Sequence, residues 1–126
     1  MDILNKSLKN EKYNILPEKI IQFGNGVLLR GLPDYYIHKS NLEGEFNGSI
    51  VVVKSTEQNK EKSFKSQDYL YTTIVRGVEN DKLIDNYFIN SSISRMLTAN
   101  TQWDQVLKCA ENHEINIVFQ IQLKKA

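Results

Sequence analysis

A short apolar run that leads straight into two closely spaced glycines constrains the fold more than any other feature of this chain. Residues 20–23 read Ile-Ile-Gln-Phe, and Gly24 and Gly26 follow with one residue between them. A run of this kind is typical of a strand covered on both faces. The first glycine permits a tight turn, and the second, without a Cβ, lets a phosphate approach the N–H groups of the next helix. The pattern predicts the first βα turn of a dinucleotide-binding domain. Leu29 stands where a third glycine is expected, so an ordinary Gly-Asn turn explains the pair equally well.

Size, charge and cysteine content exclude several classes of protein. The 126 residues suffice for one modest domain, and a net charge of +1 with 25% charged residues argues against a general nucleic-acid or membrane-surface binder. The single cysteine, Cys109, rules out an internal disulfide and a cysteine-based zinc site, and its apolar neighbours predict a buried, inert thiol. A polar amino terminus and the lack of a long apolar run predict a cytoplasmic chain without signal peptide or membrane span.

The spacing of apolar residues predicts a strand, a helix and a second strand in the first half of the chain. Pro33 either kinks a helix that begins at Val27, or lies in the first turn of a helix capped at Gly31. The buried strand at 50–53, Ile-Val-Val-Val, completes a βαβ unit with a parallel strand pair and a right-handed crossover. The apolar stripe expected on the helix consists of Leu28, Leu32, Tyr35 and Tyr36, with Leu42 close to it.

The second half alternates charged and β-prone segments. The densely charged stretch 57–68 is expected to be a solvated loop, and the runs 70–75 and 83–89 to form a hairpin. Residues 94–100 are expected to be a helical turn or loop, and 115–119 a final strand. Between them lies a helix that Asn100 or Thr101 caps. Its apolar face is expected to carry Trp103, Val106, Leu107 and Ala110.

No complete active site is readable from the residues. His38 and His113 lack metal-ligand companions at a recognisable spacing and are expected at the surface or at helix ends. The carboxylates lie mostly in loops, without an apolar setting that would raise a pKa. Arg30 follows the glycine turn by four residues, and it either reaches a phosphate or is an exposed helix arginine. The segment 54–56, Lys-Ser-Thr, stands where an acidic residue would favour NAD, and its chemistry leans toward a 2′-phosphate.

Several motifs, in one order along the chain, resemble the opening of the mannitol dehydrogenase family, in its branch that interconverts tagaturonate and altronate. The glycine turn is followed by Leu-Arg-Gly at 29–31, and the likeness extends over about residues 19–119. Further matching segments are Phe-Asn-Gly at 46–48, Val-Val-Val at 51–53, Gln-Asp at 67–68, Leu-Tyr-Thr at 70–72, Val-Arg-Gly at 75–77, Ile-Ser-Arg at 93–95 and Asn-Thr-Gln-Trp at 100–103.

The resemblance implies an NAD-linked oxidoreductase of hexuronate breakdown, with NAD preferred over NADP despite Lys54. It implies an α/β fold: a partial Rossmann-like parallel sheet with an inserted β-hairpin, truncated before the helical domain that carries a catalytic lysine in the family. A freestanding Rossmann-like nucleotide-binding or regulatory module without catalysis is the alternative. The cofactor-binding residues that the resemblance implies are Ile20, Ile21, Gln22, Phe23, Gly24, Asn25, Gly26, Val27, Leu28, Leu29, Arg30 and Gly31.

The likeness stops after Phe119, where members of the family continue with a polar Ser-Asn-Thr-Thr-Glu loop. Residues 119–125 of this chain read Phe-Gln-Ile-Gln-Leu-Lys-Lys. One added base converts a nucleotide sequence that encodes this peptide into one that encodes Phe-Ser-Asn-Thr-Thr-Glu-Glu. We therefore expect a loose lead-in at 1–18, a partial NAD-binding domain at 19–119 and a frameshifted, aberrant tail at 120–126. The hypothesis places a missing catalytic half downstream in the gene, which sequencing of the locus would check. It also predicts a marginal, aggregation-prone fragment with an uncovered sheet edge.

Overall fold

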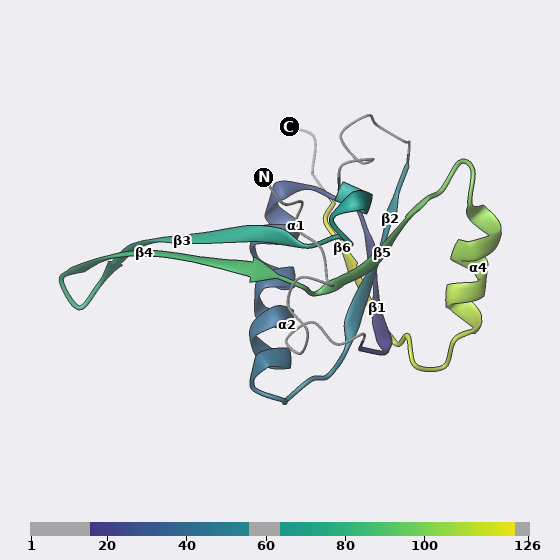
Figure 1. Cartoon of the computed structure of the whole chain (residues 1–126). Helices are drawn as coiled ribbons and strands as arrows, with labels where there is room; N and C mark the ends of the chain where they lie inside the picture. The colour runs from purple at the N-terminus through teal and green to yellow at the C-terminus, as the bar shows by residue number, and fades with distance from the viewer. Residues whose placement is uncertain (1–15, 56–63, 123–126) are drawn as a thin grey trace.

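The computed structural model describes residues 16–55 and 64–122 (Figure 1). Four parallel strands form one sheet, two longer strands form a separate antiparallel hairpin, and helices lie on both sides of the parallel sheet. The elements are β1 (Glu18–Phe23), α1 (Val27–Gly31), α2 (Pro33–Leu42), β2 (Ser49–Lys54), β3 (Tyr71–Glu79), β4 (Lys82–Asn90), β5 (Ile93–Thr98), α4 (Trp103–Glu111) and β6 (Ile117–Gln120).

The parallel sheet has the strand order β5-β2-β1-β6. Ile21 in β1 pairs with Val51 in β2 on one side and with Val118 in β6 on the other, so β1 lies inside the sheet. The chain therefore moves outward from β1 through β2 to β5 and then returns to the opposite side of β1. This reversal, together with the parallel β1–β2 pair, confirms the predicted βαβ unit and the Rossmann-like sheet.

Alternate residues of the strands supply two separate cores, because neighbouring side chains in a strand point to opposite faces. On one face β1, β2 and β5 pack beneath α2 and the base of the hairpin, and on the other they pack against α4. This two-sided burial is why the run at 50–53 is continuously apolar rather than alternating. The first core contains Ile20, Ile50, Val52, Ile93 and Met96, and the second contains Ile21, Val51, Val53, Leu97, Val106 and Cys109.

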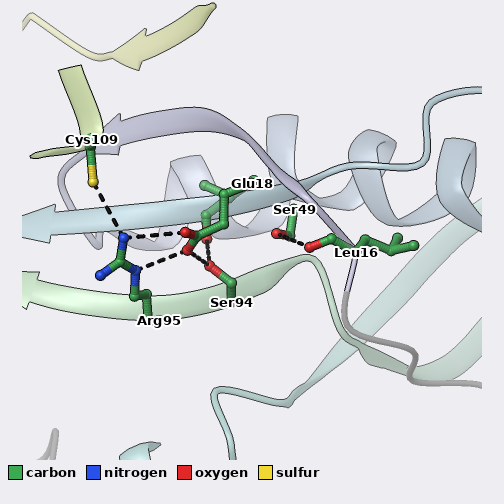
Figure 2. A network of polar contacts seen from close by, with 7 residues as sticks. Leu16, Glu18, Ser49, Ser94, Arg95 and Cys109 are labelled. Carbon is green, nitrogen blue, oxygen red and sulfur yellow. Dashed lines mark hydrogen bonds and ion pairs between the residues drawn. The ribbon is translucent and has the colours of Figure 1, made fainter. Parts of the chain in front are cut away.

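The prediction of a helical turn or loop at 94–100 is wrong, because residues 93–98 form the edge strand β5. Local sequence misled here, since the polar pair Ser94 and Arg95 interrupts the apolar pattern. Tertiary contacts satisfy both residues. Figure 2 shows Ser94 Oγ and the Arg95 guanidinium donating to the Glu18 carboxylate, with Arg95 Nε 2.9 Å from Glu18 Oε2.

The same network ties α4 to the amino-terminal end of the sheet. Arg95 Nη2 lies 3.5 Å from the buried Cys109 sulfur (Figure 2). Burial raises the pKa of the Cys109 thiol, and the nearby Arg95 cation opposes that rise. The expected buried thiol is thus confirmed. The predicted apolar face of α4 is correct in part: Val106 is buried, together with Cys109, whereas Trp103, Leu107 and Ala110 are exposed.

The residues between β1 and β2 form two helices, so each interpretation of Pro33 is correct in part. A helix does begin at Val27, but it ends at Gly31, and Leu32 separates it from α2, whose first turn contains Pro33. The break resets the helical phase. The predicted stripe through Leu28 is wrong because that residue is largely exposed, as are Leu32, Tyr36 and Leu42. The buried side chains of the two helices are Leu29, Asp34 and His38.

The remaining predictions fare differently. The hairpin is confirmed, with β3 and β4 antiparallel through a turn at Asn80 and Asp81, and it projects away from the parallel sheet (Figure 1). The cap expected at Asn100 or Thr101 is wrong, since the cap residue of α4 is Gln102. A final strand is confirmed as β6. Gln120 is its last residue, whereas the expected boundary lay before it, and residues 123–126 lie outside the described part.

Residues 57–63 of the charged stretch also lie outside the described residues. Residues 64–66 form a helical turn, and Phe64 packs against the core rather than facing solvent. The strand β1 begins at Glu18, at the end of the predicted lead-in. None of the helices in the described segments is long and apolar enough to cross a membrane.

Candidate functional site

The carboxyl ends of β1, β2 and β5 meet at one edge of the sheet and border a cavity of about 260 Å³. Ligands of open α/β sheets bind at this edge, close to the point where the strand order reverses. Each of the three strands contributes residues at its end, and the start of α4 contributes a tryptophan. The lining residues are Phe23, Gly24, Val53, Lys54, Ser55, Ala99 and Trp103.

Gly24 makes the turn at the end of β1 in a conformation that favours glycine. Its φ angle is +121°, and its N–H donates to the Val53 carbonyl oxygen at 2.8 Å. A Cβ on Gly24 would lie 3.2 Å from Leu29 Cδ1. Leu29 therefore occupies the space beside the turn, at the position where a third glycine was expected, and Gly24 accommodates it by having no side chain.

The backbone conformation at position 26 does not require a glycine. Its φ of −73° is open to any residue, and no heavy atom lies within 4 Å of the position that a Cβ would take. Gly26 is also the cap residue of α1, whose first N–H groups have no intrahelical acceptor. The neighbouring Asn25 has a buried Oδ1 without a hydrogen-bond partner among the described residues. Open space beside unpaired polar groups fits a ligand that approaches the backbone at this turn.

Two buried polar residues, Gln22 and Asp34, form hydrogen bonds next to the Gly24 turn. Gln22 Nε2 donates to Asp34 Oδ2 at 3.1 Å and to the Gly24 carbonyl oxygen at 3.2 Å, and both Gln22 and Asp34 are fully buried. Burial raises the pKa of Asp34 to about 7, although the Gln22 hydrogen bond and the Arg30 charge lower it. This corrects the expectation that no carboxylate has an apolar setting. The signal in the sequence was Gln22, a polar residue inside an apolar strand, which needs a buried partner.

His38 is buried inside α2, so its expected place at the surface or at a helix end is wrong. Its Nδ1 accepts the Ser91 N–H at 3.2 Å, and its ring stacks on Phe88 with centroids 5.2 Å apart. Burial lowers the pKa of His38, which favours the neutral ring. His113 is exposed as expected. Within residues 16–55 and 64–122, no cluster of three or more His, Cys, Asp or Glu residues could hold a metal ion.

The twelve residues expected to bind the cofactor do not share one surface. Phe23 and Gly24 line the cavity, whereas Ile20, Ile21 and Leu29 belong to the buried interior. The cofactor role of the twelve stays a prediction. In the segment 54–56, which was expected to face the adenosine ribose, Lys54 ends β2 and Ser55 follows it, and both line the cavity. Thr56 lies outside the described residues.

Arg30 is not the exposed helix arginine of one alternative, and its reach to a phosphate stays a prediction. Its guanidinium is half-buried and lies over two aromatic rings, 5.6 Å from the Tyr71 centroid and 5.9 Å from that of Phe64. It lines a second cavity, together with Val27 and Gly31, away from the ends of β2 and β5.

Two residues of the first cavity, Ala99 and Trp103, were not predicted as site residues. Both depend on β5, since Ala99 follows that strand and Trp103 begins the next helix. The Ala99 N–H donates to the Lys54 carbonyl oxygen at 2.8 Å, which brings the two strand ends together. A prediction of residues 93–98 as a strand would have placed the end of β5 beside the ends of β1 and β2, and so would have indicated Ala99 and Trp103 as site residues.

The comparison with protein-family models finds none that matches. Among characterised proteins, the chain is similar to altronate oxidoreductases. It is 35% identical to that of Halalkalibacterium halodurans over 118 residues, which is 93% of this chain and 23% of that protein. It is 38% identical to that of Shigella sonnei over 104 residues, 82% of this chain and 22% of that protein. The chain thus spans about a quarter of the length of these relatives, and the predicted resemblance is confirmed.

Two solved structures share the fold. Mannitol 2-dehydrogenase of Pseudomonas fluorescens, solved as a ternary complex with NAD and D-mannitol, superposes with a TM-score of 0.75 at 23% identity. The match covers 91% of this chain and 25% of that one. A substrate-free D-sorbitol dehydrogenase superposes with a TM-score of 0.74 at 25% identity, over 93% of this chain and 26% of that one. The predicted α/β fold, a parallel sheet with an inserted hairpin, is confirmed.

Proposed function

We propose that this chain is the NAD-binding portion of an oxidoreductase that interconverts tagaturonate and altronate. The observation that carries the proposal is the cavity at the carboxyl ends of β1, β2 and β5, bordered by Gly24 next to the open space at Gly26. Similarity to altronate oxidoreductases over 93% of the chain supports the substrate pair, and the NAD complex of the mannitol dehydrogenase supports the cofactor.

The residues of the site suit the parts of a dinucleotide. The unpaired N–H groups at the start of α1, beyond Gly26, would hold the pyrophosphate, because a helix N-terminus favours negative charge. Lys54 is the last residue of β2 and Ser55 follows it, at the place where Rossmann-type domains hold the adenosine ribose. The indole of Trp103 and the ring of Phe23 give the cavity its apolar walls.

Catalysis requires both the cofactor, which this chain would bind, and a general base. When bound, the nicotinamide ring supplies the hydride acceptor or donor. The described residues bind and orient the cofactor, whereas the general base implied by the resemblance is a lysine of the helical domain. A catalytic half encoded downstream would supply that lysine, and its co-expression with this chain should yield altronate-dependent reduction of NAD.

The test uses Trp103, the only tryptophan of the chain, which stands at the wall of the cavity. Titration with NADH should quench its fluorescence and produce saturable energy transfer to the reduced nicotinamide. NADPH should bind more weakly if NAD is the cofactor. The absence of any saturable signal from a folded chain would refute the proposal.

Two glycines make a matched pair for this test. Gly26→Val should keep the fold, because φ and the surrounding space both admit a side chain, yet it should reduce NADH affinity at least about tenfold by blocking the approach. Gly77→Val in β3, where a Cβ likewise meets nothing within 4 Å, should leave the affinity unchanged. Equal affinities in the two variants would place the cofactor elsewhere.

A further inference from the structure

The second cavity lies between α1 and the first part of β3, and its volume is about 320 Å³. It shares no lining residue with the cavity at the strand ends, so it is a separate site. Binding sites for small organic molecules begin at about this size. Its walls are Val27, Arg30, Gly31, Tyr71, Thr72, Thr73 and Ile74.

Arg30 brings a guanidinium cation to this cavity. Its side chain forms no hydrogen bond or ion pair with any residue in 16–55 or 64–122, and its Nε is buried without a partner. The Arg30 charge acts at a distance on the Asp34 carboxyl group, which accepts its hydrogen bond from Gln22 and not from Arg30. A buried N–H of a charged group without an acceptor is costly, so an acceptor from outside the described chain is the expected partner.

The walls hold the Arg30 guanidinium in place from two sides. The rings of Tyr71 and Phe64 lie 5.6 and 5.9 Å from it, close enough for cation–π attraction. The Tyr71 hydroxyl donates to the Arg30 carbonyl oxygen at 2.9 Å, which fixes α1 against β3. Arg30 is thereby positioned before any ligand arrives.

A second unpaired polar group lines the same cavity. Thr73 Oγ1 is buried and has no hydrogen-bond partner among the described residues. A hydroxyl and a planar guanidinium are donors that together suit the oxygens of a carboxylate or a phosphate.

We propose that the cavity between α1 and β3 is an oxyanion site in which Arg30 binds a carboxylate or phosphate group and Thr73 adds a hydrogen bond. Two sources supply such a group. One is the carboxylate of a six-carbon sugar acid, and this source rests on the proposed function. The other is a phosphate, and the oxyanion site itself does not depend on the proposed function.

The experiment measures binding to the full chain by calorimetry with three probes: D-altronate, inorganic phosphate, and the uncharged six-carbon polyol D-mannitol. At least one anion should bind saturably and mannitol should not, because only the anions pair with Arg30. Binding of altronate alone identifies a sugar-acid carboxylate as the ligand, and binding of phosphate identifies a phosphate. Failure of both anions, or equal binding of mannitol, would overturn the site.

Variants separate the site from the fold and from the cofactor cavity. Arg30→Gln should weaken anion binding at least tenfold, and Arg30→Lys should restore only part of it, because a lysine lacks the planar fork. Arg76→Gln removes the same charge from the exposed hairpin and should leave anion binding unchanged. Unchanged binding in Arg30→Gln, with its melting temperature intact, would refute the assignment. The NADH signal from Trp103 reports separately on the proposed function, so either can fail alone.

Discussion

Asp34 is a fully buried carboxyl group whose ionisation the fold opposes, and replacing it by asparagine tests this directly. Burial raises its pKa from the ordinary value of 3.8 to about 7. Each unit of difference between folded and unfolded pKa values corresponds to about 1.4 kcal/mol. The three units therefore correspond to a destabilisation of at most about 4 kcal/mol when the group is ionised.

The sign follows from which state binds the proton more tightly. The folded pKa lies above the unfolded one, so well below pH 3.8 the carboxyl is neutral in both states and costs nothing. As the pH rises toward 7 the unfolded chain releases the proton first, and the folded state loses stability. Above pH 7 the loss is complete and constant. The side-chain amide of the Asp34→Asn variant has no proton to lose in this range, so the variant escapes this loss.

A second effect of Asp34→Asn lowers its stability by the same amount at every pH. Asp34 Oδ1 has no hydrogen-bond partner among the described residues, so an amide nitrogen in its place is an unpaired buried donor that costs about 1–3 kcal/mol. Asp34→Asn should therefore be less stable than the parent at pH 4 and more stable by about 1–3 kcal/mol at pH 8.

Urea unfolding from pH 4 to pH 8, followed by circular dichroism, measures the free energy of unfolding of both chains. Their difference should change by about 3–4 kcal/mol across this range, whatever the size of that constant effect. Asp81→Asn is the control, because Asp81 is an exposed turn residue with φ +62°, which asparagine tolerates equally well. Its effect should stay within about 0.5 kcal/mol. A difference between Asp34→Asn and the parent that does not vary with pH would refute the reasoning.

Two further predictions concern the turn and the thiol. Gly24→Ala should destabilise the chain by about 1–3 kcal/mol in urea unfolding, because φ is +121° and the methyl group meets Leu29; full stability would contradict this account of the turn. Cys109 should react with a thiol reagent at least about 100-fold more slowly in the native chain than in urea, since only 2% of it is exposed and its pKa is raised. Rapid native labelling would show that α4 does not stay packed on the sheet.

Elements whose pattern is local were predictable from the sequence. The strand at 20–23 and its glycine turn, the strand at 50–53 and the hairpin each carry their signal within a few neighbouring residues. The glycine at position 24 is such a signal, because few other residues adopt the φ of +121° that this turn requires. The family resemblance rests on the same segments.

Contacts between distant segments decided the rest. In β5 the side chains of Ser94 and Arg95 donate hydrogen bonds to Glu18, which lies more than seventy residues earlier. The buried Asp34 carboxyl accepts a hydrogen bond from Gln22, which joins α2 to β1. Local sequence shows which side chains are polar and not which partner satisfies them.

The sequence by itself determined the glycine turn and the apolar strands on which the dinucleotide-binding interpretation rests. Tertiary structure alone decided where Arg30 lies, which faces of the helices are buried, and that Trp103 reaches the ends of the strands. The physical reason is the range of the interactions. Turn geometry and strand pattern are fixed within a few residues, whereas burial and hydrogen bonding depend on partners that only the packed sheet brings together.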